Sequence, residues 1–295
     1  METVICGNTV DVLKTLPDKS VQMCVTSPPY FNLRDYSVSE QIGTETTPKQ
    51  YIERLVDVFH NLHRVLKDDG TLWLNIADTY ASKNYDGIKR KELIGIPWTL
   101  AFALRADGWY LRQDIIWHKP NAMPESVKDR CGRGHEYLFL LTKSDKYYFD
   151  YKAIREPLSP ATVNDLKHRK NMHNKGGKKG TFGAEARPDL YRSRAEYVSA
   201  DGLRNKRSVW TINTSCYSGS HFAVFPEKLV ELCILAGCPE GGTVIDVFAG
   251  SCTTGVVAKR LNRHFIGIEL NPEYCEMGRA RLGGSNHACQ TDLKL

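Results

Sequence analysis

The chain has 295 residues, of which 41% are apolar, so it can form one large domain or a domain with an insertion. Its net charge of +6 favours a polyanionic partner, and its nine cysteines include no CxxC pair, which argues against a zinc or disulfide framework. The N-terminus has no signal-peptide pattern and no apolar run reaches the roughly 20 residues of a membrane span. We therefore expect a cytoplasmic protein with no bound metal and no membrane partner.

Strands and helices are predicted to alternate along residues 1–150. Residues 21–25 form a short apolar strand, and the apolar side chains of residues 48–66 recur at helical spacing. Pro48 suits the first turn of that helix, and Gly70 is expected just after its end. The later elements of this half are a strand at 71–78, a helix at 97–106, and strands at 109–119 and 136–144.

The segment 151–210 interrupts this alternation. It contains 14 Lys and Arg residues against six Asp and Glu residues, an excess of eight positive charges in a chain whose net charge is +6. Such a concentration favours contact with a phosphate backbone, although a solvated surface insertion could have the same composition. We therefore divide the chain into a first half (1–150), a basic insertion (151–210) and a second half (211–295).

The alternation returns after residue 221. The expected elements are a helix at 226–236, a strand at 243–250, a helix at 253–261, a strand at 264–270 and a helix at 272–282. A series of such units predicts an α/β fold, with a mostly parallel sheet that helices cover on both faces.

The first of two short motifs with chemical potential is Thr26-Ser27-Pro28-Pro29-Tyr30, which follows the strand at 21–25. Two consecutive prolines fix φ twice and remove two backbone donors, and they bias the preceding residues toward extended backbone. A rigid turn therefore holds Ser27 and Tyr30 at the end of a strand. The turn is a candidate catalytic site, and a purely structural loop is the alternative.

The second motif is the sequence DVFAGSCTTG at residues 246–255, between a predicted strand and a predicted helix. Small residues at 249–251 let a ligand approach the backbone, and the start of the helix supplies free N–H groups. Glu269, at the end of the next strand, can accept hydrogen bonds from a ribose diol. The sequence contains no GxxxxGK[ST] motif, which argues against a nucleoside triphosphatase.

With these two motifs in this order, and HFAVFPEKLV shortly before the second, the chain resembles the β-order amino-group DNA methyltransferases, and among them the SPPY-type cytosine-N4-specific enzymes. The resemblance covers about residues 1–150 and 208–282. It implies a seven-stranded Rossmann-like sheet, S-adenosyl-L-methionine (SAM) as cofactor, and double-stranded DNA as partner, with the target base flipped out. It also implies a target-recognition region where the basic insertion falls, and a cognate restriction endonuclease that shares the DNA site.

The resemblance also implies roles for individual residues. Ser27, Pro28, Pro29 and Tyr30 would be catalytic: the Ser27 hydroxyl and the Pro28 carbonyl would accept the N–H groups of the base amine, and Tyr30 would stack on the flipped base. The residues that would bind the cofactor are Asn8, Phe222, Phe225, Pro226, Asp246, Phe248, Ala249, Gly250, Ser251 and Glu269. In the segment 130–144, His135 or Arg133 would line the base pocket.

Two residues depart from the family pattern. Asn8 replaces an Asp that normally reaches the cofactor adenine, and its amide oxygen can still accept a hydrogen bond, but without charge. Cys252 replaces a usual Gly, and its Cβ would crowd the cofactor if the backbone there requires a positive φ. We expect both departures to change the detail of the cofactor contacts.

The target base has two candidates. In the family, Ser at the first motif position usually accompanies cytosine N4, and Asp or Asn usually accompanies adenine N6, so Ser27 favours cytosine N4 and adenine N6 is the alternative. Cytosine C5 chemistry is disfavoured because no Pro in the chain is followed by Cys. RNA, a protein amide and a non-catalytic DNA-binding module are further alternatives, and the intact first motif argues against the last.

Overall fold

The computed structural model describes residues 2–34, 38–164, 202–216, 223–224 and 226–283. The chain divides into two compact units: a larger one of residues Met1–Asp150 and Ser208–Leu295, and a smaller one of residues Tyr151–Arg207. The smaller unit ends three residues before the expected end of the basic insertion, because residues 209–211 pair with the sheet of the larger unit. No helix in the described ranges combines the length and the apolar character needed to cross a membrane.

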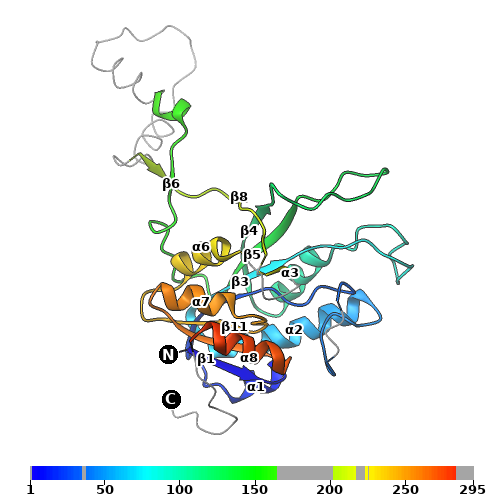
Figure 1. Ribbon diagram of the computed structural model, residues 1–295, viewed down its shortest axis with the longest axis horizontal. Helices are drawn as coiled ribbons and strands as arrows, with labels where there is room; N and C mark the ends of the chain where they lie inside the picture. The colour runs from blue at the N-terminus through cyan, green and yellow to red at the C-terminus, as the bar shows by residue number, and fades with distance from the viewer. Residues whose placement is uncertain (1, 35–37, 165–201, 217–222, 225, 284–295) are drawn as a thin grey trace. The chain divides into compact units, whose positions relative to one another are not determined.

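The larger unit is built on an eight-stranded sheet with the strand order β1-β12-β11-β2-β3-β5-β4-β8 (Figure 1). The strands are β1 (Glu2–Cys6), β2 (Val21–Thr26), β3 (Leu66–Ile76), β4 (Tyr110–His118), β5 (His135–Thr142), β8 (Val209–Thr211), β11 (Thr243–Asp246) and β12 (His264–Glu269). Neighbouring strands are parallel, except that β5 is antiparallel to both β3 and β4. This confirms the predicted mostly parallel α/β sheet, and β8 adds an eighth strand to the expected seven.

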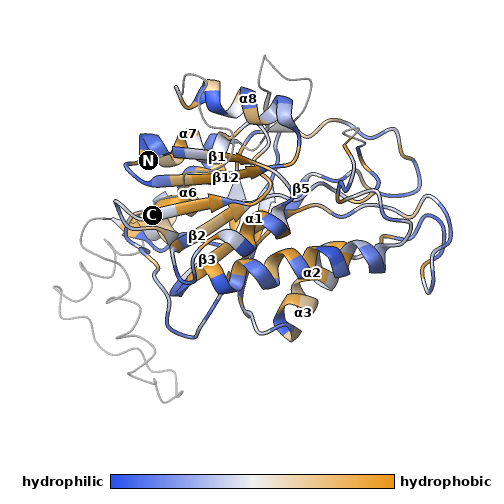
Figure 2. Cartoon of the chain, turned by 90° about the horizontal axis from the view of Figure 1, so that it is seen from below, coloured by the Kyte–Doolittle hydropathy of each residue, from blue (hydrophilic) through white to orange (hydrophobic). Residues whose placement is uncertain are grey.

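Helices cover both faces of this sheet, as predicted, and the apolar colouring of Figure 2 lies mainly on the strands and on the helix sides that face them. One face carries α1 (Thr9–Thr15), α2 (Pro48–Val65) and α3 (Ile96–Ala106), and the other carries α6 (Glu227–Gly237), α7 (Thr253–Arg260) and α8 (Pro272–Arg281). The predicted helices match α2, α3, α6, α7 and α8 closely, whereas α1 was not predicted. In α2, α3 and α6 the apolar residues recur at helical spacing and are buried.

Helix α2 shows both a correct and a wrong prediction. Its start is as expected, with Thr47 accepting a hydrogen bond from the Gln50 N–H and Pro48 in the first turn. Its end is not, because β3 begins immediately after Val65 and includes Gly70. The register between β2 and β3 shifts here, and a Cβ on Gly70 would lie 2.8 Å from the Lys67 carbonyl. Gly70 therefore lies within the irregular part of β3, where a larger residue would clash with the backbone, and it does not end the helix.

Four short strands lie outside the main sheet. In the larger unit β9 (Ser215–Cys216) pairs antiparallel with β10 (Ala223–Val224), and in the smaller unit β6 (Glu156–Pro157) pairs antiparallel with β7 (Leu203–Arg204). The Glu156 carboxylate of β6 forms ion pairs with Arg204, Lys206 and Arg207. Most of the basic insertion, residues 165–201, lies outside the described residues.

The direction of the strands decides which residues can meet. The parallel strands β2, β3, β11 and β12 all end at one edge of the sheet. Since β5 runs the opposite way, its first residues lie at that same edge, where Tyr137 pairs with Ile76 at the end of β3. The turn after β2, the loop after β11, the end of β12 and the start of β5 therefore come together.

The loop after β11 is fastened to α8 through Cys252. This residue has a φ of 58°, the left-handed conformation on which the expected crowding depended. Its side chain is fully buried against Gly278 of α8, where an added Cβ would lie 2.4 Å from Sγ and 3.2 Å from Cβ of Cys252. The thiol thus occupies the space that the glycine leaves open, and burial raises its pKa to about 12.

The substitution Gly278→Ala is expected to destabilise the protein by about 1–3 kcal/mol, because the added Cβ would clash with the buried Cys252 sulfur. Urea unfolding of Gly278→Ala, Cys252→Ala and the double variant measures this. The double variant should lose less stability than the two single losses together, since the alanine at 252 removes the clashing sulfur. Gly134→Ala is the control, because no atom lies within 4 Å of its added Cβ. Strictly additive losses would show that the two residues do not compete for space.

Candidate functional site

A cavity of about 660 Å³ opens at the edge of the sheet where these segments meet. Ser27, Pro28, Pro29 and Tyr30 line it from the first motif. From the second motif and its surroundings come Asp246, Phe248, Ala249, Gly250, Ser251 and Glu269, and Asn8 also lines it. Residues separated by more than 200 positions in the chain therefore share one cavity, and its volume suits a cofactor-sized ligand.

The turn after β2 is held in place by a hydrogen bond from α2. The Tyr51 hydroxyl of α2 donates a hydrogen bond to the Pro29 carbonyl over 2.8 Å, and Tyr51 itself is fully buried. Among the described residues no donor reaches the Pro28 carbonyl, which keeps its lone pairs for a ligand. The rigid Pro-Pro turn predicted from the sequence thus has a second constraint that the sequence did not reveal.

A buried polar network lies behind Ser27. The Ser27 hydroxyl donates to the Tyr30 Oη over 3.3 Å, and the Tyr30 hydroxyl donates to Glu136 Oε2 over 2.7 Å. The amide of Asn75 donates to the same Glu136 oxygen over 2.7 Å, and the Lys119 ammonium pairs with Glu136 Oε1. Burial and the neighbouring Glu136 raise the pKa of Tyr30 well above its usual value, so the phenol keeps its proton and remains a donor.

Sequence reasoning missed three of these residues. Asn75, Lys119 and Glu136 all line the cavity, whereas His135 and Arg133, the residues expected there, do not. The Arg133 guanidinium instead pairs with Glu125 and lies 5.5 Å from the Tyr80 ring, and His135 is exposed. The alternation of side chains along a strand could have indicated Glu136, because the side chains of residues 135 and 136 must point to opposite faces of β5.

Asp246 joins the two motifs directly. Its buried carboxylate accepts hydrogen bonds from the hydroxyls of Thr26 over 2.7 Å and Thr254 over 2.6 Å, and from the Phe248 N–H over 3.1 Å. Thr26 is the last residue of β2, so this bond ties the turn after β2 to the loop after β11. Burial raises the pKa of Asp246, and the three hydrogen bonds oppose that rise.

Glu269 is held by backbone groups at the end of β12. Its Oε2 accepts from the Gly250 N–H and its Oε1 from the Asn271 N–H, each over 2.8 Å. Burial raises its pKa, and these hydrogen bonds favour the charged form. At Gly250 φ is 49° and an added Cβ would meet no atom within 4 Å, so the backbone beside Glu269 is open to a ligand. Each carboxylate oxygen keeps a lone pair, which is what binding a ribose diol requires.

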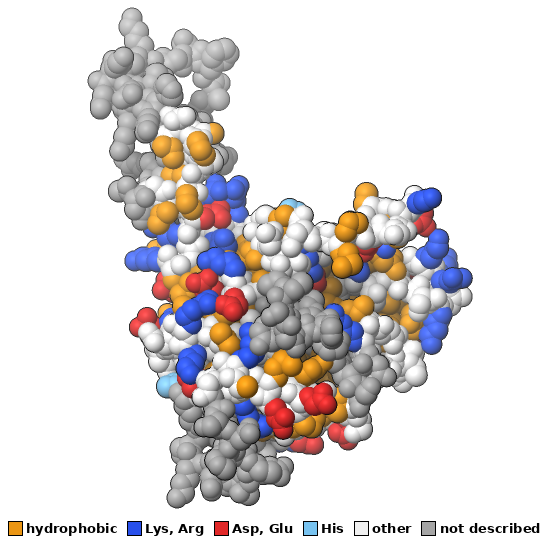
Figure 3. Space-filling model, viewed as in Figure 1, with side chains coloured by type: hydrophobic (Ala, Val, Ile, Leu, Met, Phe, Trp, Pro, Cys, Tyr) orange, Lys and Arg blue, Asp and Glu red, His pale blue; other side chains and the backbone are white. Residues whose placement is uncertain are grey.

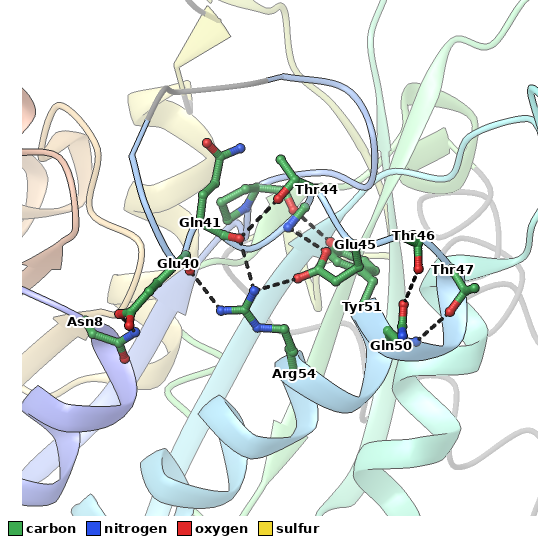
Figure 4. Close-up of polar contacts among 12 residues, drawn as sticks. Asn8, Glu40, Gln41, Thr44, Glu45, Thr46, Thr47, Gln50, Tyr51 and Arg54 are labelled. Atoms are coloured by element: carbon green, nitrogen blue, oxygen red, sulfur yellow. Dashed lines mark hydrogen bonds and ion pairs between the residues drawn. The ribbon is translucent and has the colours of Figure 1, made fainter.

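Asn8 lines the cavity, and its side chain already has partners within the protein. The oxygen accepts from the Val10 N–H over 3.0 Å and caps α1, while the amide nitrogen donates to Glu40 over 3.2 Å (Figure 4). Arg54 of α2 fastens the segment that carries Glu40, by donating to the carbonyls of Glu40 and Gln41 and pairing with Glu45. This part of the cavity wall is therefore held by polar contacts with α2.

The remaining expected cofactor residues lie elsewhere or are not described. Pro226 is the residue before α6 and borders a shallow hollow with residues 211–214, outside the main cavity. Phe222 and Phe225 lie outside the described residues. Across the described part of the chain, no three His, Cys, Asp or Glu side chains come together as metal ligands would.

Comparisons with known proteins agree with this geometry. The family model described as "DNA methylase", of the N6/N4 type, matches residues 21–280. The Type II methyltransferase M.Cfr9I of Citrobacter freundii is 44% identical, with 96% of this chain and 88% of that protein covered. The Type II methyltransferase M.SmaI of Serratia marcescens is 45% identical, with 95% and 90% covered.

Solved structures share the fold. The PvuII DNA methyltransferase (cytosine-N4-specific) superposes with a TM-score of 0.67 at 19% identity, covering 97% of this chain and 88% of that one. A DNA modification methylase of Thermus thermophilus, in complex with S-adenosyl-L-methionine, superposes with a TM-score of 0.62 at 21% identity, covering 96% and 93%. On the family match and the two close relatives, the chain belongs to the N6/N4 family of DNA methylases.

Proposed function

We propose that this DNA methylase modifies the exocyclic N4 amine of cytosine in duplex DNA, with the base flipped into the cavity. The observation that carries the proposal is that Ser27, Pro28 and Tyr30 line the same cavity as Gly250 and Glu269. A cofactor bound at the loop after β11 and a base bound at the turn after β2 would therefore meet inside this cavity. Asn8, Asp246, Phe248, Ala249 and Ser251 complete the proposed cofactor side.

The amine needs help from the protein because its lone pair is delocalised into the base ring. Acceptors aimed at its N–H groups favour the tetrahedral nitrogen as it forms, which lowers the barrier more than it strengthens binding. The Ser27 hydroxyl donates its own proton to Tyr30 and accepts from Asn75, which leaves one lone pair for an N–H group of the amine. The Pro28 carbonyl is the acceptor for the other, and Pro29, fixed by Tyr51, keeps the turn rigid. The Tyr30 ring forms part of the wall against which the base would stack.

The cofactor of this methylase is S-adenosyl-L-methionine, which supplies an electrophilic methyl group when it is bound. The residues present suit the adenosine part of this cofactor. The Glu269 carboxylate can accept hydrogen bonds from the ribose hydroxyls, and the absence of a side chain at Gly250 lets the ligand approach the backbone. The side chain of Cys252 is directed to Gly278 and so does not compete for this space.

Cytosine N4 is preferred over adenine N6 because Ser, and not Asp or Asn, begins the catalytic motif. A solved structural neighbour is described as cytosine-N4-specific, which supports the same choice. Adenine N6 is the second candidate, because the family that matches this chain includes both amines.

Duplex DNA and a cognate restriction endonuclease are the proposed partners. The similar proteins are Type II methyltransferases, a class that acts beside a restriction enzyme. Besides the basic insertion (151–210), the loop between β3 and α3 carries a cluster of positive side chains, visible at the right of Figure 3. These exposed residues are Lys83, Lys89, Arg90 and Lys91. Lys91 is paired with Asp129, and the exposed positive side chains of this loop suit phosphate contacts.

Ser27→Ala should reduce the single-turnover methylation rate by roughly 10²–10³, the effect of losing one charge-stabilising hydrogen bond in a dry site. DNA affinity should fall much less, because the bond strengthens mainly in the transition state. Mass spectrometry of digested substrate DNA should find N4-methylcytosine for the wild type. Ser20→Ala is the control, since its hydroxyl bonds to the Pro17 carbonyl outside the cavity. N6-methyladenine as product would reject the cytosine assignment, and a wild-type rate for Ser27→Ala would reject the role of Ser27.

Glu269→Ala should weaken SAM binding by about 1–3 kcal/mol, because the carboxylate supplies hydrogen bonds to a polar ligand. Isothermal titration calorimetry measures the change, and circular dichroism verifies the fold. Glu273→Ala is a matched control, since Glu273 is exposed in the first turn of α8 and does not line the cavity. Equal SAM affinity for the wild type and a folded Glu269→Ala variant would move the ribose site elsewhere.

A further inference from the structure

The network behind Ser27 contains a buried carboxylate to which the proposed function assigns no role. Glu136 is 8% exposed and lies at the start of β5, opposite Trp117 of β4. Its two oxygens have different partners: Oε1 pairs with the Lys119 ammonium, and Oε2 accepts from Tyr30 and Asn75. Lys119 is itself held close to the Trp117 ring, with Nζ 4.3 Å from the ring centroid. A carboxylate with this many partners in a buried site has one defined position.

The orientation of Asn75 follows from these contacts. Its Nδ2 lies 2.7 Å from Glu136 Oε2 and 2.8 Å from Tyr30 Oη, whereas its Oδ1 is buried and meets no donor within the described part of the chain. An amide turned the other way would place an oxygen against a carboxylate. The unpaired Asn75 Oδ1 costs free energy, and this cost is offset by the hydrogen bond that Asn75 Nδ2 donates to Glu136.

The hydrogen bonds along the network all run in one direction. Tyr30 gives its proton to Glu136, so its oxygen can only accept from Ser27. Ser27 in turn gives its proton to Tyr30 and accepts from Asn75 Nδ2 over 3.4 Å, so one lone pair of Ser27 Oγ remains for a ligand in the cavity. The charge on Glu136 thus decides that Ser27 is an acceptor and not a donor.

We propose that Glu136 is a positioning residue for the methylation reaction, acting through Tyr30 to present Ser27 as an acceptor and to receive the proton that the amine loses. This inference rests on the proposed function, since it needs an amine at Ser27. It adds a carboxylate that lies about 110 positions after the catalytic motif in the chain.

The proton transfers balance along this path. The amine N–H bond breaks as its proton moves to Ser27 Oγ, the Ser27 proton moves to Tyr30 Oη, and the Tyr30 proton moves to Glu136 Oε2. The nitrogen lone pair would form the new bond to the methyl group, while the electron pair of the methyl–sulfur bond would stay on the cofactor sulfur. The nitrogen then keeps the electron pair of its broken N–H bond and becomes a neutral methylated amine, and the carboxylate becomes a carboxylic acid. No oxidant, reductant or further reactant is required.

The charged and titratable groups around Glu136 are few. Lys119 of the segment after β4 and Tyr30 of the turn after β2 contact it directly, and β3 contributes the neutral Asn75. The neighbouring His135 and its cross-strand partner His118 stand on the other face of the hairpin, where His118 contacts Thr211.

Glu136→Gln tests the proposal with almost no change in shape. Lys119 requires an oxygen on its side, so the new amide nitrogen faces Tyr30 and Asn75 and donates where the carboxylate accepted. The chain of hydrogen bonds is then reversed, and Ser27 receives a proton from Tyr30. We expect the single-turnover rate with saturating SAM and DNA to fall by roughly 10²–10³, as for loss of the Ser27 acceptor, and SAM and DNA affinities to be unchanged.

A split between rate and affinity separates this role from a structural one. A residue that only supports the fold would change SAM or DNA affinity and thermal stability together with the rate, whereas Glu136→Gln should lower the single-turnover rate alone. Glu125→Gln is the matched control, because Glu125 also pairs with arginines in the loop after β4 but lies outside the cavity. It should keep the wild-type rate and both affinities.

A double variant tests whether Glu136 acts through Tyr30. Tyr30→Phe removes the connecting hydroxyl, so Glu136→Gln added to it should reduce the rate no further. Multiplying losses, or a wild-type single-turnover rate for Glu136→Gln, would overturn the inference. A wild-type protein that methylates no base amine would instead reject the proposed function, so the two failures are distinguishable.

Discussion

The hydrogen bond from the Thr26 hydroxyl to Asp246 is the contact on which the site depends. It joins the end of β2 to the end of β11 across 220 positions in the sequence. These strands are parallel neighbours in the sheet, so their carboxyl ends lie at the same edge. The Pro-Pro turn follows β2 directly, and the glycine loop follows β11 directly. With Thr254 and the Phe248 N–H as further donors, Asp246 sets the position of both motifs at once.

Three buried or half-buried carboxylates line one cavity, and each is stabilised in a different way. Asp246 accepts from two hydroxyls and one N–H group, Glu269 from two backbone N–H groups, and Glu136 pairs with a lysine and accepts from Tyr30 and Asn75. A carboxylate removed from water is costly unless it is paired in this manner. The same partners also fix each carboxylate in direction, so the cavity presents oriented polar groups before any ligand arrives.

Rigidity around the site comes from packing that involves no ligand. Tyr51 holds the Pro29 carbonyl, Arg54 holds the segment that carries Glu40, and the Cys252 thiol fits against Gly278. The departure from the family pattern at Cys252 is thus matched by a small residue in a different helix. The departure at Asn8 is matched by Glu40, which accepts from its amide nitrogen. Both changes were visible in the sequence, but their partners were not.

The sequence by itself determined the fold class, the order of the main strands and helices, and the two motifs. These features depend on local physics: apolar periodicity distinguishes strand from helix, and consecutive prolines or glycines restrict the backbone where they stand. The same reasoning failed at Gly70, whose role depends on an irregular pairing with β2, and it missed β8, which pairs with β4 after a long insertion.

Only the tertiary structure decided how the two motifs are joined and what stands behind Ser27. Asn75, Lys119 and Glu136 belong to three separate segments, and the antiparallel direction of β5 alone brings the start of that strand to the ends of the parallel ones. Sequence spacing does not encode that direction, or which face a side chain takes once the strand is paired. His135 and Glu136 are neighbours in the chain, and the register of β5 sends only Glu136 into the cavity, because side chains alternate across a strand and pairing between distant segments sets the phase.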